Sequence, residues 1–288
     1  MRSWLSLLAL AVVVAALGAW VYQRPKAGES LTYALSTMKP GQVARARLER
    51  TGAPRLPGET PPVTAIVLER RNGEWRMSEP YAARADAFQV ERLLSILEAR
   101  STARYEADDP ARFGLKAPMA VLKTDDQTFA YGAINPTTRE QYVMTGGKVY
   151  VVPLNYAATL PRNVEALLTK QLFGAEEVPV RFDLPGFTVA MQDGTWAVAP
   201  ITNEAGPDER NAWVAAWREA SALTVSRYPG PSPEQEISVV LKNGRTITLG
   251  IAQRSPDVVL VREDEGIAYQ FFGEPGRKLL MPPGEKSR

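Results

Sequence analysis

One serine–lysine pair and four acidic clusters are the residues of this sequence whose types and spacing could do chemistry. Ser36 and Lys39 fit the S-x-x-K spacing of a lysine-activated serine, but no S-D-N or K-T-G segment accompanies them. Three of the four acidic clusters lie at expected turns or linkers, and none has the spacing of an EF-hand loop. These clusters, which could supply general acids, general bases or oxygen ligands, are Asp108-Asp109, Asp125-Asp126, Glu176-Glu177 and Glu263-Asp264-Glu265.

Histidine and cysteine are both absent from the 288 residues, which narrows the chemistry further. Without them the chain has no Ser-His-Asp triad, no histidine or cysteine ligand for zinc, no thiol nucleophile and no disulfide. The sequence also holds no G-x-G-x-x-G motif, and Gly146-Gly147-Lys148 lacks the other residues of a P-loop. We therefore expect a non-enzyme with no catalytic residue, no cofactor and no metal. A hydrolase that uses carboxylates or an oxygen-bound metal is the enzymatic alternative that stays open.

The composition is that of an ordinary globular protein, with 45% apolar and 23% charged residues. The 34 basic and 32 acidic residues nearly balance and form no basic stripe, so we expect no nucleic-acid partner. The length suits one large domain or two ordinary ones. No small-molecule ligand is identified by these residues.

Residues 4–22 form an uncharged apolar run that predicts a membrane anchor. About 20 apolar residues span the hydrocarbon core, and aromatic rings at both ends suit the membrane interfaces. The residues that define the anchor are Trp4, Leu8, Val12, Leu17, Trp20 and Tyr22. A signal peptide cleaved near residues 16–18 is the alternative, although the run is longer than the roughly 7–15 residues typical of one. We expect a single-pass protein of the bacterial inner membrane, in contact with the lipid bilayer, with its C-terminal body in the periplasm.

After the anchor, alternating apolar residues and turn dipeptides predict an α+β body. Residues 63–78 indicate a β-hairpin around Asn72-Gly73, and Asp86 is expected to cap the helix that follows. A strand at 102–107 and an antiparallel four-stranded meander at 118–152 come next. Residues 153–174 indicate a helix in two pieces that Pro161 divides.

The second half of the chain repeats this order, with a second hairpin around Asp193-Gly194. The repeat predicts two similar modules, each with a Trp-containing hairpin, one helix and a four-stranded meander. The residues that define the repeat, and that are expected to be structural, are Trp75, Pro80, Gly114, Gly132, Tyr150, Trp196, Pro200, Gly250 and Tyr269. The expected segments are the anchor and a short linker (1–29), the first module with its N-terminal strands (30–153), a helical connector (154–176), the second module (177–281) and a disordered tail (282–288).

The tryptophans could stack on sugars, because flat aromatic faces bind carbohydrate rings as well as partner side chains. Trp75 and Trp196, however, recur at equivalent points of the repeat, and Trp213 and Trp217 fall on the apolar face of an expected helix. Core packing is therefore favoured for these residues. Binding of an envelope polysaccharide or peptidoglycan through exposed aromatic residues remains the alternative.

The segment FGLKAPMAVLKT and the meander after it, up to residue 152, resemble the DUF4340 family. The residues that carry the match are Trp75, Pro80, Phe113, Gly114, Leu115, Pro118, Gly132, Tyr142, Tyr150 and Val151. The second copy keeps Trp196, Pro200, Gly250 and Tyr269 but has residues 229–235 in place of the F-G-L step. The resemblance covers residues 63–273 and implies an N-terminal membrane segment and a domain of unknown function, with no catalytic residue to carry over. Some members are encoded near ABC-type export components, which implies an accessory role in the envelope.

These observations together predict a non-enzymatic, membrane-anchored, extracytoplasmic interaction or accessory protein of the bacterial cell envelope. Other envelope proteins are the expected partners, and an association with an ABC-type export machine is expected from the resemblance.

Overall fold

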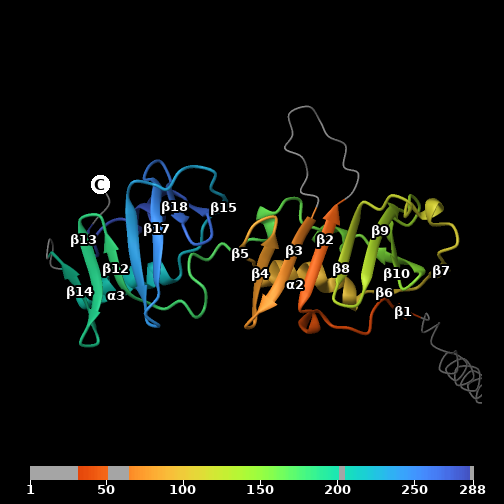
Figure 1. Cartoon of the computed structure of the whole chain (residues 1–288), viewed down its shortest axis with the longest axis horizontal. Coiled ribbons are helices and arrows are strands. Elements are labelled where there is room, and N and C mark those ends of the chain that lie inside the picture. The colour runs from red at the N-terminus through yellow and green to blue at the C-terminus, as the bar shows by residue number, and fades with distance from the viewer. Residues whose placement is uncertain (1–31, 51–64, 201–204, 286–288) are drawn as a thin grey trace, which may run out of the picture.

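The structure, a computed structural model, describes residues 32–50, 65–200 and 205–285. They form two large antiparallel sheets that follow one another along the long axis of the body (Figure 1). The fold is α+β, with mostly strands and few helices, as the sequence predicts. The predicted anchor residues Trp4 to Tyr22 lie outside the described part of the chain. Within that part, no helix is long and apolar enough to cross a membrane.

The first sheet has nine strands in the order β5-β4-β3-β2-β8-β9-β10-β11-β7. Their bounds are β2 (Arg45–Arg50), β3 (Ala65–Arg71), β4 (Glu74–Glu79), β5 (Ala83–Arg84), β7 (Arg104–Glu106), β8 (Ala120–Thr124), β9 (Thr128–Ile134), β10 (Glu140–Thr145) and β11 (Lys148–Pro153). A separate two-stranded ladder pairs β1 (Tyr33–Ala34) with β6 (Arg100–Ser101). The meander β8 to β11 lies where the turn dipeptides predict it.

The second sheet has eight strands in the order β14-β13-β12-β16-β17-β18-β19-β15. Their bounds are β12 (Pro179–Leu184), β13 (Phe187–Gln192), β14 (Thr195–Ala199), β15 (Thr224–Arg227), β16 (Glu236–Leu241), β17 (Thr246–Gln253), β18 (Val258–Arg262) and β19 (Ile267–Phe271). With β5 set aside, each position of this sheet has a counterpart at the same position of the first sheet.

Three α-helices and five 3-10 turns complete the described fold. The helices are α2 (Ala87–Leu94), α3 (Pro207–Arg218) and α4 (Gly273–Leu279), and the turns are η1 (Pro40–Gln42), η2 (Ser95–Glu98), η3 (Pro110–Phe113), η4 (Ala157–Thr159) and η5 (Glu165–Leu167). In α2, Asp86 accepts the N–H of Gln89 at 3.1 Å, which is the predicted cap. The apolar face of α2 joins the buried residues of both sheets in one continuous core.

Both hairpins close at the predicted two-residue turns. Asn72 and Gly73, with φ of 53° and 84°, connect β3 to β4. Asp193 and Gly194, with φ of 47° and 81°, connect β13 to β14. Positive φ at both positions matches the twist of paired strands, and Asn, Asp and Gly tolerate it best. The turn chemistry is thus local and readable from the sequence.

A second, smaller core lies on the other face of the first sheet, where residues 113–115 cover β9. It is formed by Phe113, Leu115, Ala130 and Val149. Gly132 lies directly beneath this cover, since a β-carbon there would overlap the carbonyl oxygen of Phe113 and lie 2.9 Å from Leu115 Cγ. In the second sheet Gly250 is covered instead by Pro233, whose Cδ would lie 2.6 Å from an added β-carbon.

Gly132→Ala is expected to lower the free energy of unfolding by about 1–3 kcal/mol, because the added methyl group must displace the backbone of residue 113. Gly41→Ala is the matched control, since nothing lies within 4 Å of its β-carbon position. Urea denaturation followed by tryptophan fluorescence measures both variants. Equal stability of the two variants would contradict the close approach of residues 113–115 to β9.

The connector and the C-terminus differ from the prediction. Residues 153–174 contain the end of β11 and the 3-10 turns η4 and η5 instead of a two-piece α-helix, because the end of this segment pairs with backbone on both sides. Helix α4 was not predicted, since its glycines and proline disfavour a helix in isolation. Residues 282–285, predicted as disordered tail, form a turn in which Pro283 is buried, and residues 286–288 lie outside the described part.

Candidate functional site

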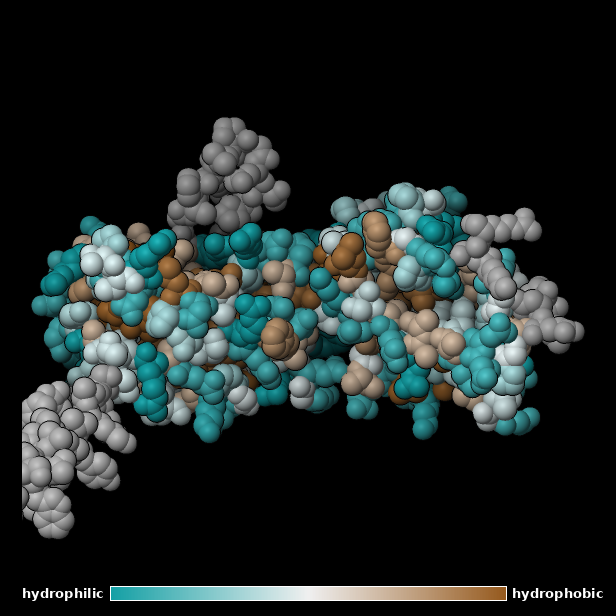
Figure 2. Space-filling model, turned by 180° about the vertical axis from the view of Figure 1, so that it is seen from behind, coloured by the Kyte–Doolittle hydropathy of each residue, from teal (hydrophilic) through white to brown (hydrophobic). Residues whose placement is uncertain are grey.

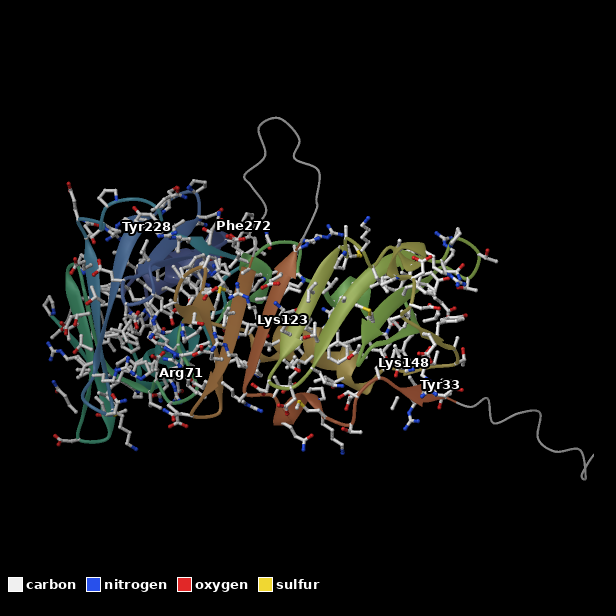
Figure 3. The ribbon with its side chains drawn as sticks, turned by 45° about the vertical axis from the view of Figure 1, so that its right-hand side comes forward. Tyr33, Arg71, Lys123, Lys148, Tyr228 and Phe272 are labelled. Carbon is white, nitrogen blue, oxygen red and sulfur yellow. The ribbon has the colours of Figure 1, made fainter. Side chains whose placement is uncertain are left out.

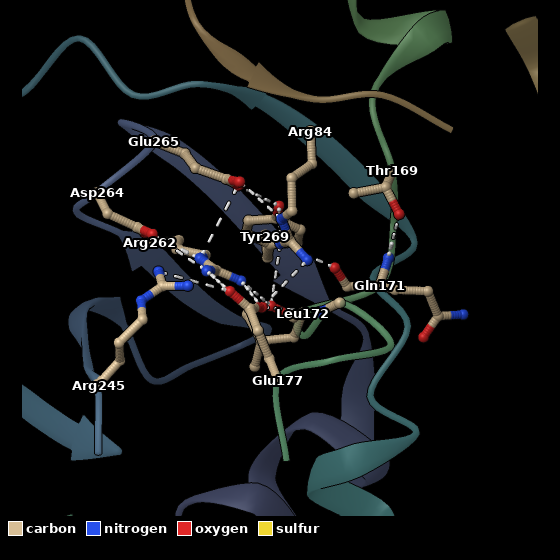
Figure 4. Close-up of polar contacts among 11 residues, drawn as sticks. Arg84, Thr169, Gln171, Leu172, Glu177, Arg245, Arg262, Asp264, Glu265 and Tyr269 are labelled. Carbon is tan, nitrogen blue, oxygen red and sulfur yellow. Dashed lines mark hydrogen bonds and ion pairs between the residues drawn. The ribbon is translucent and has the colours of Figure 1, made fainter. Parts of the chain in front are cut away.

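The two sheets are linked through residues 167–172, called the connector from here on, which begin at the end of η5 and pair with backbone on both sides. Two backbone hydrogen bonds, of 2.8 and 3.2 Å, join it to residues 84–86. Two more, of 3.0 and 2.8 Å, join it to residues 220–222. This link positions a largely buried polar cluster, called the junction below, which consists of Arg84, Glu177, Arg262, Glu265, Tyr269 and the exposed Asp264 (Figure 4).

Arg84 is the contribution of the first sheet to the junction. It ends β5 and is only 6% exposed. Its Nε donates to Glu265 Oε1 at 2.6 Å, and its Nη2 donates to the hydroxyl of Tyr269 at 2.9 Å. The same Nη2 also reaches the carbonyl oxygens of Gln171 and Leu172, at 3.1 and 3.0 Å. One guanidinium therefore bonds to the connector and to the second sheet at once.

Arg262, at the end of β18, is the second cation of the junction and is fully buried. Its Nη1 and Nη2 grip the carboxylate of Glu177 in a fork, at 2.7 and 2.6 Å. Its Nε donates to Asp264 Oδ1 at 2.9 Å, and Nη1 also donates to the Leu172 carbonyl at 2.8 Å. Bidentate pairs of this kind are among the strongest hydrogen bonds in proteins. Because Leu172 accepts from both arginines, the two halves of the junction meet at one carbonyl.

The surroundings of Glu177 and Tyr269 in the junction shift the pKa of each group. Burial alone would raise the pKa of the Glu177 carboxyl, but hydrogen bonds from Arg262 and from the Gly174 N–H, and the charges of both arginines, lower this pKa to about 2. Burial raises the pKa of the Tyr269 hydroxyl. The carboxylate thus stays ionised and the phenol stays protonated at neutral pH.

Glu177→Gln is expected to flatten the acid side of the stability profile. The folded pKa, about 2, is below the ordinary value of 4.5, so the contribution of Glu177 is complete above about pH 4.5 and is lost as the pH falls toward 2. The difference corresponds to about 3 kcal/mol. Denaturant unfolding at pH 2.5 to 7 measures this slope. Glu176→Gln, at the exposed neighbour, is the control and should keep the wild-type slope.

The junction is suited to hold the two sheets in a fixed position relative to one another. Proton transfer near neutral pH works best with a group whose pKa lies near that pH, and the pKa of Glu177 is far below it. In the part of the chain that the structure describes, no group of three or more acidic side chains is arranged to hold a metal ion. The arginines make their hydrogen bonds to carboxylates, to a phenol and to backbone carbonyls of the protein itself.

The other candidates from the sequence lie apart from the junction and serve turns. Ser36 Oγ accepts the N–H of Met38, within the S-x-x-K segment itself. Asp109 accepts the N–H of Ala111 and so caps η3. Asp125 accepts the N–H groups of Ala44 and Arg45, at 2.7 and 2.9 Å, and ties β8 to β2.

The four tryptophans within the described residues lie mainly in the core. Trp75, Trp213 and Trp217 are buried and Trp196 is half-buried. Of the other repeat-defining residues, Gly132, Tyr150, Gly250 and Tyr269 lie in corresponding strands of the two sheets, Gly114 follows η3, and Pro80 and Pro200 are exposed at the ends of β4 and β14. Tyr269 alone among them belongs to the junction.

Sequence reasoning missed Arg84 and Arg262, and it did not connect the acidic clusters at 176–177 and 263–265 with any cation. A signal was present for Arg262. It follows Val258 and Leu260 at every second residue of an apolar strand, so the alternation places it on the buried face. A buried arginine requires carboxylate partners.

Outside the junction, two hollows of about 510 Å³ on the described surface have the size of ligand sites. One lies between α3, α4 and residues 281–285. The other lies beside the residue 229–235 segment and is lined by Tyr228, Gln235, Gln253 and Arg254, among others. Figure 3 shows Tyr228 and Phe272 in the half of the body that holds the second sheet, away from Tyr33 and Lys148.

Comparison with known proteins gives one match. The profile of DUF4340, described as a domain of unknown function, matches residues 75–227, from the tryptophan of the first hairpin to the last residue of β15. No curated protein matches this chain, and no solved structure does. The matched segment spans α2, the first meander, the connector and α3, and includes Arg84 and Glu177 of the junction. This match covers more than half of the chain, and the chain therefore belongs to the DUF4340 family.

Proposed function

We propose that this protein is a non-enzymatic, membrane-anchored interaction or accessory protein of the bacterial cell envelope. The apolar run at residues 4–22 supports a single anchor in the inner membrane, with the body in the periplasm. Membership of a family of unknown function is compatible with this role, and the export association remains part of the proposal. The expected partners are other envelope proteins and the lipid bilayer.

The observation that carries the proposal is that the charged side chains of the junction bond to one another. Its guanidinium groups donate to its carboxylates and to backbone carbonyls of the chain itself, at the point where the connector meets both sheets. Such an arrangement favours a rigid body that presents its surfaces to a partner. Figure 2 shows one such surface, with hydrophilic residues interspersed with smaller apolar areas.

We also propose that the body arose as two copies of one module. The matching strand orders support this, as does the cover over Gly132 and Gly250 at equivalent points of β9 and β17. Duplication would explain why Trp75 and Trp196 both follow a two-residue turn. The copies differ in the covering segment, which is F-G-L in one and residues 229–235 in the other.

Crosslinking in intact cells tests the interaction role. The full-length chain, tagged at its C-terminus, is expected to form discrete crosslinked species with envelope proteins that copurify from detergent. A fusion of residues 1–29 to an unrelated domain is the control for anchoring alone and should not form these species. If the chain stays monomeric and yields no such species, the proposal is contradicted. The orientation is contradicted if a C-terminal reporter of a kind that works only in the cytoplasm is found to be active.

Glycan binding is a second candidate function, favoured by the hollow beside residues 229–235. It combines an aromatic ring, Tyr228, with the amides of Gln235 and Gln253 and the guanidinium of Arg254, which donates to Gln235 at 2.9 and 3.1 Å. Aromatic faces and planar polar groups together suit a sugar chain. Sedimentation of the full-length chain with insoluble peptidoglycan tests this. Tyr228→Ala should abolish the binding and Tyr105→Ala, in the first sheet, should not.

A further inference from the structure

The hollow between α3, α4 and residues 281–285 has a wall that hydrogen bonds within the chain hold in place. Trp213 Nε1 donates to the Met281 carbonyl at 2.7 Å, and Trp217 Nε1 donates to the Leu279 carbonyl at 3.0 Å. The two indole rings lie 5.8 Å apart and also contact Phe182. Residues 279–281 are thereby held against α3 by hydrogen bonds within the chain.

The floor of the hollow is apolar, and two short side chains leave room above it. Ala212 and Ala216, one turn apart on α3, are both exposed and line it together with Trp213, Met281 and Pro283. Its volume of about 510 Å³ is within the range of about 300–1,000 Å³ that ligand pockets have. It can therefore bury apolar side chains of a partner.

The rim of the hollow is acidic. It carries the carboxylates of Glu209, Glu274 and Glu285 but one ammonium group, that of Lys278, which pairs with Glu274 at 2.8 Å. Glu209 accepts a hydrogen bond from the backbone N–H of Gly206, a neutral donor, at 2.8 Å. An apolar floor inside a negative rim is complementary to an apolar group flanked by cations.

We propose that this hollow is the docking site for a segment of a partner protein in which apolar side chains are flanked by lysine or arginine. The proposal rests on the interaction function proposed above and specifies the chemistry of the partner. The apolar side chains enter over Ala212 and Ala216, and the flanking cations face Glu209 and Glu285.

Binding of a labelled synthetic peptide tests the proposal directly. The probe has two leucines flanked on each side by lysine, and its partner probe has glutamate in place of each lysine. The full-length chain in nanodiscs of zwitterionic lipid should bind the lysine peptide, more weakly as salt rises, and should not bind the glutamate peptide. Empty nanodiscs subtract any partition into lipid.

Two pairs of variants locate the site. Ala216→Leu should weaken binding by about tenfold or more, because the added side chain fills volume that the peptide would bury. Ala215→Leu, also exposed on α3 but outside this hollow, should bind like wild type. Glu285→Lys should weaken binding by about twofold to fivefold and Glu219→Lys should not, since Glu219 lies outside the hollow. Equal binding by Ala216→Leu and Ala215→Leu would overturn the proposal.

Lys286-Ser287-Arg288, which follow Glu285, offer a further outcome. If the lysine peptide binds only after residues 286–288 are removed, this basic segment of the chain itself competes for the hollow and the partner proposal is overturned. If envelope proteins are crosslinked in cells but no form of the chain binds the peptide, this inference fails while the interaction function stands. If the peptide binds but no envelope protein is crosslinked, the interaction function fails.

Discussion

Arg262→Ala is expected to lower the free energy of unfolding by about 3–5 kcal/mol, a large part of the stability of an ordinary domain. Arg262 is fully buried and holds Glu177 with two hydrogen bonds and Asp264 with two more. Its removal leaves carboxylates at the junction without their main cation, and a buried charge without a partner is costly. Equilibrium unfolding in guanidinium chloride at neutral pH measures the loss.

Arg245→Ala is the matched control for this experiment. Arg245 also approaches Glu177, but its side chain is 61% exposed and the closest N–O distance is 4.0 Å. Its removal should cost less than about 1 kcal/mol. The double variant Arg262→Met with Glu177→Gln should recover part of the loss, because it removes both charges of the pair. A loss below about 1 kcal/mol for Arg262→Ala would mean that the bonds of Arg262 to Glu177, Asp264 and the Leu172 carbonyl do not stabilise the folded chain.

Local features of the fold could be predicted from the sequence because their causes are local. Asn72-Gly73 and Asp193-Gly194 tolerate the positive φ that tight hairpins need, and the structure has both turns. Asp86 is followed by the helical spacing of Val90, Leu93 and Leu94, and the cap and the buried face are both present. The alternation of the meander likewise depends only on neighbouring residues.

The junction could not be assembled from the sequence, because its members are far apart along the chain. Arg84 and Glu265 are separated by 181 positions, and Arg262 and Glu177 by 85. A pattern of neighbouring residues contains no information on which charge at such a distance is the partner. Alternation in β18 indicates only that Arg262 points inward and requires some anion.

Helix α4 and the hollow between α3, α4 and residues 281–285 could not be predicted for a different reason. Gly273, Pro275 and Gly276 within α4 have poor intrinsic helix propensity, and tertiary contacts override it. A β-carbon at Gly276 would lie 2.6 Å from the carbonyl oxygen of Phe271, so the glycine that disfavours the helix also allows it to pack against β19. The hollow could not be predicted either, because Ala216 lines it beside the buried Trp217 and is exposed although both residues follow the helical spacing of α3.

Trp217→Ala is expected to lower the free energy of unfolding by about 3–5 kcal/mol, the range for truncation of a large buried aromatic side chain. Trp217 is fully buried in α3 and lies among Phe173, Phe182 and Trp213, with ring centroids 6.5, 5.4 and 5.8 Å away. Truncation opens a cavity that this rigid aromatic cluster cannot refill, and it leaves the Leu279 carbonyl without its indole donor.

Two further variants separate these causes. Trp217→Phe keeps most of the ring volume but loses the hydrogen bond to residue 279, so it should cost about 1–2 kcal/mol. Trp196→Ala should cost less than Trp217→Ala, because Trp196 is half-buried on the edge strand β14. Unfolding is followed by circular dichroism, since tryptophan fluorescence changes in each variant. If Trp196→Ala proves the more costly, the hairpin tryptophan rather than the helix would be the main aromatic support of the second sheet.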